Sequence, residues 1–177
     1  METQQARYLT LEFTCKEEGE LFPSETGKLY FIQQAEKWLF PETPIIAWAL
    51  TETEAVFMIE RPRDINEFKS VVHKFNRKYS RYLRKKTKDK SKLITSKLVY
   101  LHEYSKADLR DQVKKIHLTP IWQGLGDNFT EYPWTSYLHL LNPKYCNLDH
   151  IEVISWFGSK QNYRKQHHNQ LAEITEK

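Results

Sequence analysis

The segment that constrains the fold most follows Asp64, because its apolar side chains recur at steps of three and four residues. This spacing puts them on one side of a long helix that begins near Ile65, with Asp64 as its N-cap. Such a stripe has to be buried, so we expect the helix to pack on a sheet. The stripe consists of Phe68, Val72, Phe75, Tyr79 and Tyr82.

The other side of the same helix is basic. Its cations also recur at steps of three and four, which spaces them at roughly 5–6 Å, comparable to phosphates along a strand. Between positions 69 and 92 there are 11 Lys or Arg residues and one acid, so the net charge of +4 hides an acidic remainder. This asymmetry predicts a polyanionic partner. The cations expected to contact it here are Lys74, Arg77, Lys78, Arg81, Arg84, Lys85, Lys86 and Lys88.

Two other interpretations of a basic amphipathic helix are a merely solvated face and a membrane-surface patch. Solvated faces usually intersperse glutamate, and none occurs between Glu67 and Glu103. We therefore favour nucleic acid as the partner, with salt-dependent binding through its phosphates.

The remaining pattern gives the order of elements. We expect strands over 7–13, 45–50, 55–60 and 92–104, and helices over 28–40, from near 65, and from 105 to about 118, where Pro120 ends the last one. The order β-α-β-β-α-β is the ferredoxin-like pattern, an α+β fold with an antiparallel sheet and its helices on one face. We expect the opposite face to be free for a ligand.

Beyond this core we expect a C-terminal helical extension, with two stretches from 148 to 176 broken at Gly158. The corresponding division is a ferredoxin-fold domain over 1–140 and a helical tail over 141–177. Cys15 and Cys146 predict reduced thiols, and the absence of a signal peptide or a long apolar run predicts a soluble, cytoplasmic protein with no membrane partner. Five glycines leave little scope for a Gly-rich phosphate loop.

Three stretches resemble the REP-associated tyrosine transposases, a family of single-tyrosine transposases. The most specific is IHLTPIWQGLGDNFTEYPWTSY, over 116–137; the others are LDHIEVISWFGSKQNY, over 148–163, and the basic helix FKSVVHKFNRKYSRYL. The resemblance implies a ferredoxin-like nuclease scaffold that recognises single-stranded DNA hairpins. In active members two histidines hold a divalent metal, a helical tyrosine attacks the phosphate, and a polar residue one turn later completes the metal shell.

This chain departs from the family at every chemical position. The histidine pair falls at Glu54 and Val56, the nucleophile at Lys115, and the polar partner at Thr119. We therefore expect no catalysis and no cofactor; a divalent metal such as magnesium is expected only if activity is retained. Lys115 becomes a ninth candidate contact for nucleic acid, because a lysine cation pairs with phosphate.

Other side chains have ordinary structural interpretations. For Trp48, Trp122 and Trp134 we favour core packing over base stacking. For His102 and His117 we favour satisfied or exposed structural roles, because metal sites need clustered ligands. His167 and His168 fall in a polar tail and are expected to be solvated.

The leading hypothesis is thus a non-catalytic, transposase-derived protein that binds single-stranded or hairpin DNA. An RNA-binding module on the same fold remains open, as does a divergent nickase that uses Glu54 with an unrecognised nucleophile. A fourth reading is a scaffold for interaction only, and the sequence does not choose between monomer and homodimer.

Overall fold

The computed structural model describes residues 6–101, 104–142 and 148–175. Four strands form one antiparallel sheet in the order β2-β3-β1-β4, confirming the ferredoxin-like α+β fold. The strands are β1 (Tyr8–Cys15), β2 (Ile45–Leu50), β3 (Glu54–Glu60) and β4 (Ile94–Leu101). The helices are α1 (Glu25–Trp38), α2 (Ile65–Thr87), α3 (Lys106–Trp122), α4 (Tyr137–Leu141), α5 (His150–Phe157) and α6 (Lys160–Thr175).

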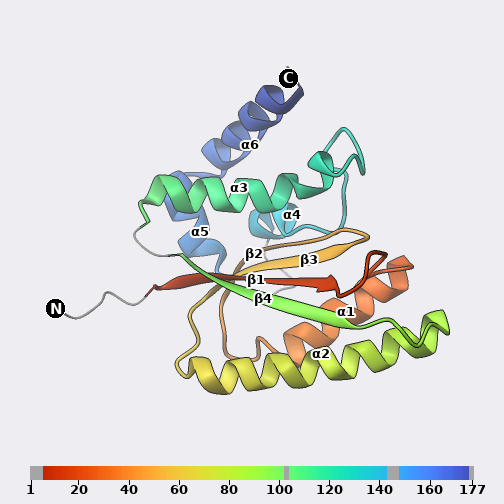
Figure 1. The fold of residues 1–177 in the computed structure, drawn as a ribbon. Coiled ribbons are helices and arrows are strands. Elements are labelled where there is room, and N and C mark those ends of the chain that lie inside the picture. Colours follow the sequence, from red (N-terminus) through yellow and green to blue (C-terminus); the bar gives the residue numbers. More distant parts are fainter. Residues whose placement is uncertain (1–5, 102–103, 143–147, 176–177) are drawn as a thin grey trace.

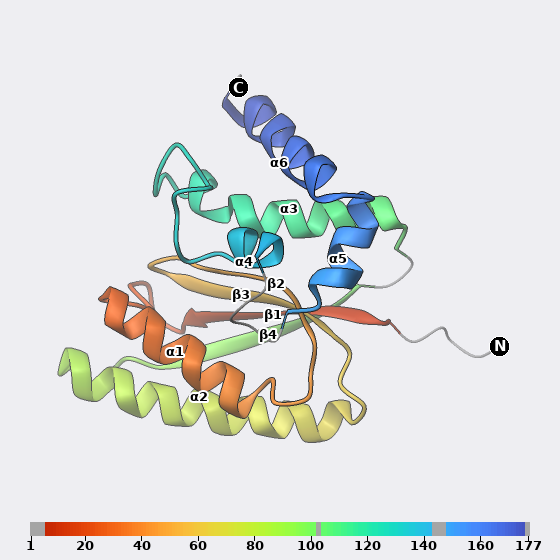
Figure 2. The ribbon, with the colours of Figure 1, turned by 180° about the vertical axis from the view of Figure 1, so that it is seen from behind.

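Helices cover both faces of the sheet. Helices α1 and α2 lie on one face, and α3, α4 and α5 lie on the other, with α6 beyond α3 (Figures 1 and 2). The expectation of a free opposite face was therefore wrong. The reason is visible in β2, where all six residues are buried, so that this strand needs cover on both sides.

The core between the sheet and the α1–α2 layer is aromatic. The ring of Phe13 on β1 lies 5.3 Å from that of Phe31 on α1 and 5.6 Å from that of Phe75 on α2. Both contacts are edge-on or tilted, the geometry that aromatic pairs prefer. The apolar stripe of α2 is thus buried against the sheet, as its spacing predicts; its buried members include Phe68, Val72, Phe75 and Tyr79.

Segment 132–136, the centre of the stretch that resembles the transposases, closes one edge of the sheet. The N–H of Leu50 on β2 donates to the carbonyl of Trp134 at 2.8 Å, and the N–H of Ser136 donates to the carbonyl of Trp48 at 2.9 Å. The Tyr132 hydroxyl donates to the carbonyl of Leu50 at 2.9 Å. These bonds satisfy backbone groups that an edge strand otherwise exposes.

Two helix boundaries differ from the sequence-based expectation. Helix α1 begins a turn early, because the Ser24 hydroxyl accepts from the Gly27 N–H and caps it. Helix α3 continues past Pro120 to Trp122. Proline removes only its own N–H, and here the last turn is held by bonds that Pro120 does not donate, such as Gln123 N–H to the Thr119 carbonyl. The break between α5 and α6 at Gly158, with φ of 81°, is confirmed.

Candidate nucleic-acid interface

Helix α2 carries the basic surface, and local interactions fix where it begins. The Asp64 carboxylate accepts from the N–H groups of Asn66 and Glu67, both at 2.9 Å. Twenty-three residues follow, with the apolar stripe facing the sheet. The basic side is consequently held toward solvent along the whole outer length of the helix.

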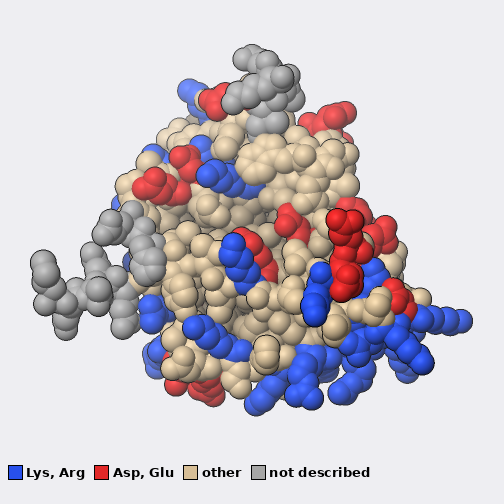
Figure 3. All heavy atoms as spheres, viewed as in Figure 1, with Lys and Arg blue, Asp and Glu red and all other residues tan. Residues whose placement is uncertain are grey.

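We call the cations of α2 from Lys74 onward, together with the C-cap Lys88, the basic face. The cations gather over the C-terminal half of α2 and the loop into β4, at the lower edge of Figure 3. Arg84 is half-buried, and its Nε donates to the Lys92 carbonyl at 2.8 Å, so it also holds that loop. The exposed members are Lys74, Arg77, Lys78, Arg81, Lys85, Lys86 and Lys88.

Aromatic rings from α1 and α2 lie beside the basic face. The rings of Tyr30 and Tyr82 stack with centroids 4.2 Å apart. The Lys78 ammonium lies 4.3 Å from the ring centroid of Trp38, whose side chain is 48% exposed. Cations and aromatic faces in one strip are the two components that proteins use to bind single strands.

The positions that correspond to the family's metal ligands lie on the other face of the sheet. Glu54 is half-buried at the start of β3, and its carboxylate accepts from Gln123 Nε2 at 2.7 Å. Burial and the nearby Glu12 carboxylate raise the pKa of Glu54. Val56, opposite Glu12 on β1, is 9% exposed and offers no donor atom. The described residues contain no group of three His, Cys, Asp or Glu side chains arranged to hold a metal ion.

Lys115 and Thr119 lie one turn apart on α3, in the layer opposite the basic face. The Thr119 hydroxyl donates to the Lys115 carbonyl at 3.0 Å, which ties it to its own helix. Lys115 is exposed at a hollow of about 320 Å³ that Asp108 and Asp111 also line. The structure therefore gathers eight of the nine predicted contacts on and just after α2 and places Lys115 apart, beside two carboxylates.

Sequence reasoning missed a buried polar chain in the α3 layer, and the solvated reading of His167 was wrong. His167 has no exposed surface, and its Nε2 lies 2.9 Å from Nδ1 of His117, which is equally buried. The spacing of Tyr163, His167 and Leu171 at i, i+4, i+8 was an available signal of a buried row. His168 is exposed, as expected.

The bond partners set the direction of this chain. His167 Nδ1 lies 2.8 Å from the Tyr163 carbonyl, which only accepts, so Nδ1 carries the proton and Nε2 accepts from His117. Nε2 of His117 then accepts from the Ser136 hydroxyl at 2.8 Å, whose oxygen accepts from the Trp48 N–H at 2.9 Å. Burial lowers the pKa of His167 to about 4 and that of His117 well below its usual value.

The tryptophan predictions divide. Trp48 is 5% exposed, which confirms core packing, and Trp134 is half-buried, with its indole donating to Glu25. Trp122 is 48% exposed at the end of α3, so core packing was wrong there. Cys15 is a free thiol, whereas His102 and Cys146 lie outside the described residues.

No protein-family model matches the chain, and no curated protein matches it. Among solved structures, it is similar to a REP-associated tyrosine transposase bound to a REP hairpin, with 12% identity over 83% of this chain and 87% of that one, at a TM-score of 0.57. A bacterial tRNA(His) guanylyltransferase-like protein in complex with GTP matches at 10% identity over 72% of each chain, with a TM-score of 0.41. No helix in the described ranges is long and apolar enough to cross a membrane. The chain thus shares the fold of the transposase. The TM-score of 0.41 with the guanylyltransferase-like protein is too low to indicate a shared fold.

Proposed function

We propose that this protein binds single-stranded or hairpin DNA without cutting it. The observation that carries the proposal is the basic face: seven exposed cations on the outer side of α2 and its C-cap, with no acid among them before Asp89. Each phosphate that such a surface neutralises releases counterions, so binding is electrostatic and salt-dependent. The aromatic rings beside it add stacking surfaces for unpaired bases.

The site positions support a non-catalytic role. A metal-assisted transfer needs several oxygen or nitrogen donors around one ion, and Val56 supplies none. Glu54 is engaged by Gln123, and a lysine at position 115 cannot form the phosphotyrosine link of the resembling family. The fold that the chain shares with a hairpin-bound transposase agrees with a hairpin ligand.

The test is fluorescence anisotropy with a labelled DNA hairpin that has single-stranded flanks. We expect the logarithm of affinity to fall with the logarithm of salt at a slope of about −4, because each of six contacts to a single strand contributes about −0.7. The triple variant Lys78→Glu, Arg81→Glu, Lys85→Glu should bind at least about 100-fold more weakly at moderate salt.

A matched control reverses three exposed cations in the opposite layer: Lys106→Glu, Arg164→Glu and Lys165→Glu. It changes the total charge equally and should retain most of the affinity. Equal losses in both triple variants would contradict a localised interface. Lys115→Glu tests the ninth candidate, and unchanged affinity for the hairpin removes Lys115 from the interface.

Two further measurements separate the alternatives. Matched hairpins in DNA and RNA show which nucleic acid the basic face prefers, and tighter RNA binding would replace the DNA assignment. Incubating the labelled hairpin with Mg²⁺ or Mn²⁺ tests cleavage. A covalent protein–DNA product would overturn the non-catalytic assignment and point to Glu54, with its neighbour Glu12, as metal ligands.

A further inference from the structure

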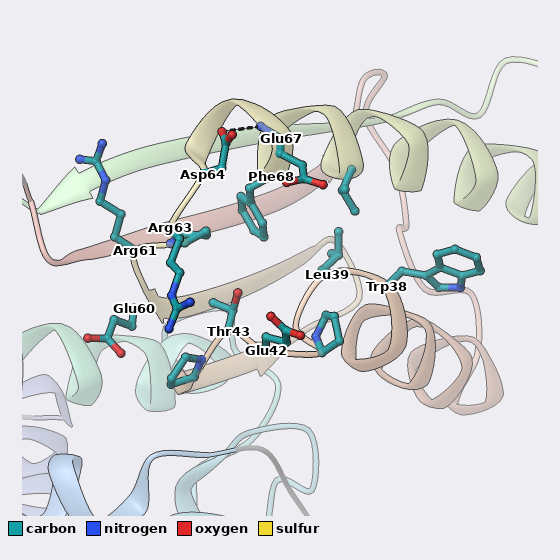
Figure 4. A pocket seen from close by; sticks show the side chains of 14 residues that line it. Trp38, Leu39, Glu42, Thr43, Glu60, Arg61, Arg63, Asp64, Glu67 and Phe68 are labelled. Atoms are coloured by element: carbon teal, nitrogen blue, oxygen red, sulfur yellow. Dashed lines mark hydrogen bonds between the residues drawn. The ribbon is translucent and has the colours of Figure 1, made fainter.

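A hollow of about 670 Å³ lies at the N-terminal end of α2. We call it the α2 pocket. The end of α1, the loop 41–44 and the segment 60–64 surround it, and its apolar floor includes Leu39 and Phe68 (Figure 4). Its volume falls within the range of about 300–1,000 Å³ that is common for small-molecule sites.

Trp38 forms one rim of the α2 pocket and is held in place. Its indole Nε1 donates to Gln34 Oε1 at 3.2 Å, and the Lys78 ammonium lies 4.3 Å from the ring centroid. The side chain is nevertheless 48% exposed. An oriented, half-exposed indole is a surface on which a flat aromatic ligand stacks.

Four charged side chains at the pocket form no hydrogen bond or ion pair with any described residue: Arg61, Arg63, Glu42 and Glu67. Arg63 reaches across the opening toward Thr43, and the carboxylates of Glu42 and Glu67 lie on opposite sides of it (Figure 4). The other two acids are occupied, since Glu60 pairs with Arg7 at 3.2 Å and Asp64 caps α2. The Arg61 guanidinium lies 5.8 Å from the ring centroid of Tyr100 and points away from the opening (Figure 4), so the opening itself offers one guanidinium, Arg63, and two carboxylates.

We propose that the α2 pocket binds an unpaired nucleotide of the nucleic acid that lies along the basic face. This inference rests on the proposed function. The base stacks on Trp38, and its exocyclic amine donates to Glu42 or Glu67. Lys78, which lies over Trp38, and Arg63 are at opposite ends of the pocket, so they pair with the two successive phosphates that flank the nucleotide (Figure 4). Cytosine, adenine and guanine carry such an amine and thymine does not, so the pocket discriminates against thymine.

Continuity with the basic face favours a nucleotide over a peptide. Lys78 belongs to both surfaces, because it lies over Trp38 and in the row of exposed cations on α2. Lys74, one turn nearer the pocket on α2, continues that row. A strand whose phosphates follow these cations therefore reaches Trp38, whereas a peptide gains from the row only where it carries acidic side chains at the same spacing.

The test compares a blunt DNA hairpin with the same hairpin carrying a five-nucleotide cytosine tail. In the wild-type chain the tail should tighten binding, and Trp38→Ala should reduce that gain by about 5- to 100-fold, the range for losing one base stack. Affinity for the blunt hairpin should fall much less than the gain from the tail, because the blunt hairpin has no unpaired tail to stack on Trp38. Trp122→Ala is the matched control, because this indole is equally exposed on the opposite layer.

Base preference gives a second readout that does not depend on Trp38. A thymine tail should add less affinity than a cytosine tail, and the double variant Glu42→Gln, Glu67→Gln should narrow this difference. Arg63→Ala should reduce the gain from either tail. Circular dichroism of each variant confirms that it is folded.

The outcomes separate this inference from the proposed function. Hairpin binding without any gain from the tail, or an equal gain in wild type and Trp38→Ala, overturns the pocket and leaves the proposed function standing. Absence of binding to any hairpin overturns both.

Discussion

The two helical layers of this protein treat their polar groups in opposite ways. In the α1–α2 layer, Lys28 is buried and paired with Glu25 and Glu52, but the cations of the basic face point outward, and most of them have no partner among the described residues. In the α3–α6 layer, the notable polar groups turn inward, and Ser136, His117 and His167 bond to one another without exposed surface. One sheet separates a surface suited to a ligand from a polar core that satisfies itself.

This difference indicates that one layer of the fold mainly provides stability and the other mainly provides a binding surface. Buried polar groups are stabilising only when each has a partner, so the inner chain specifies how α3, α6 and β2 pack. Exposed cations contribute little to stability, and their cost is mainly mutual repulsion, which a polyanion relieves. Changes in the α3–α6 layer should therefore alter stability, and changes on the basic face should alter binding.

The largest expected effect on stability comes from His117→Leu. The leucine keeps an apolar side chain of similar size but leaves the Ser136 hydroxyl and His167 Nε2 without their partner. Each buried polar group that loses its bond costs about 1–3 kcal/mol, so unfolding should require about 2–5 kcal/mol less. Urea denaturation measures this loss, and hairpin affinity at low urea should not change.

A double-mutant cycle sharpens this prediction. His167→Phe alone also orphans His117, but the pair His117→Leu, His167→Phe removes both members of the bond. We expect the double variant to lose less than the sum of the single losses, with a coupling of about 1–3 kcal/mol. If the two losses in free energy of unfolding are strictly additive, the two histidines do not form a hydrogen bond.

Acid should loosen the α3–α6 layer before it affects the basic face. The folded pKa of His167 is about 4 and the usual value is about 6.5, so the unfolded chain binds the proton more readily. The stability that neutral His167 contributes is complete above about pH 6.5 and is lost as the pH falls toward 4, by about 3 kcal/mol. His117 adds a loss in the same direction.

Thermal unfolding between pH 7.5 and 4.5 tests this expectation. The fall in melting temperature should be smaller in the His117→Leu, His167→Phe variant, which has neither titrating group. If the melting temperature falls equally steeply with decreasing pH in both proteins, other residues cause the acid sensitivity.

Much of the fold followed from short-range pattern. The apolar stripe from Phe68 to Tyr82 identified α2, and the order of strands identified the sheet, because both depend on periodicity alone. Pro120 was a misleading stop signal, because the last turn of α3 is closed by bonds that Pro120 does not donate, such as Gln123 N–H to the Thr119 carbonyl. The sequence also did not reveal that helices pack on the second face of the sheet, because α3 and α5 are stabilised by contacts between residues that are far apart in sequence.

The candidate interface was also predictable from the sequence only in part. The run of cations gave the basic face directly, since charge on an exposed helix needs no tertiary information. The α2 pocket was not predictable, because only the tertiary fold brings Trp38 and Glu42, at the end of α1, next to Arg63, before α2. The hydrogen bond between His117 and His167 was not predictable either, because the two residues are fifty positions apart. The spacing of Tyr163, His167 and Leu171 on α6 did indicate that His167 faces inward.

A smaller loss is expected from Ser136→Ala, which removes one hydroxyl from the same buried chain. His117 Nε2 loses its donor and the Trp48 N–H loses its acceptor. We expect a loss of about 1–3 kcal/mol in urea denaturation, below that of His117→Leu. Ser136→Thr keeps the hydroxyl and serves as the control. If Ser136→Ala leaves the free energy of unfolding unchanged, a water molecule has replaced the hydroxyl.

The smallest effects should come from the helix caps, one in each layer. Asp64→Ala removes the acceptor for two N–H groups of α2. Ser105→Ala removes the hydroxyl that accepts from the Asp108 N–H at 3.2 Å, which is half of the reciprocal cap of α3. Each should cost about 1 kcal/mol, because both caps are exposed and the helices behind them are held by packing. Amide hydrogen exchange should rise only in the first turn of the altered helix. Faster exchange across α3 in Asp64→Ala would show that the two layers are coupled through the sheet, and the separation between a binding layer and a stabilising layer would then fail.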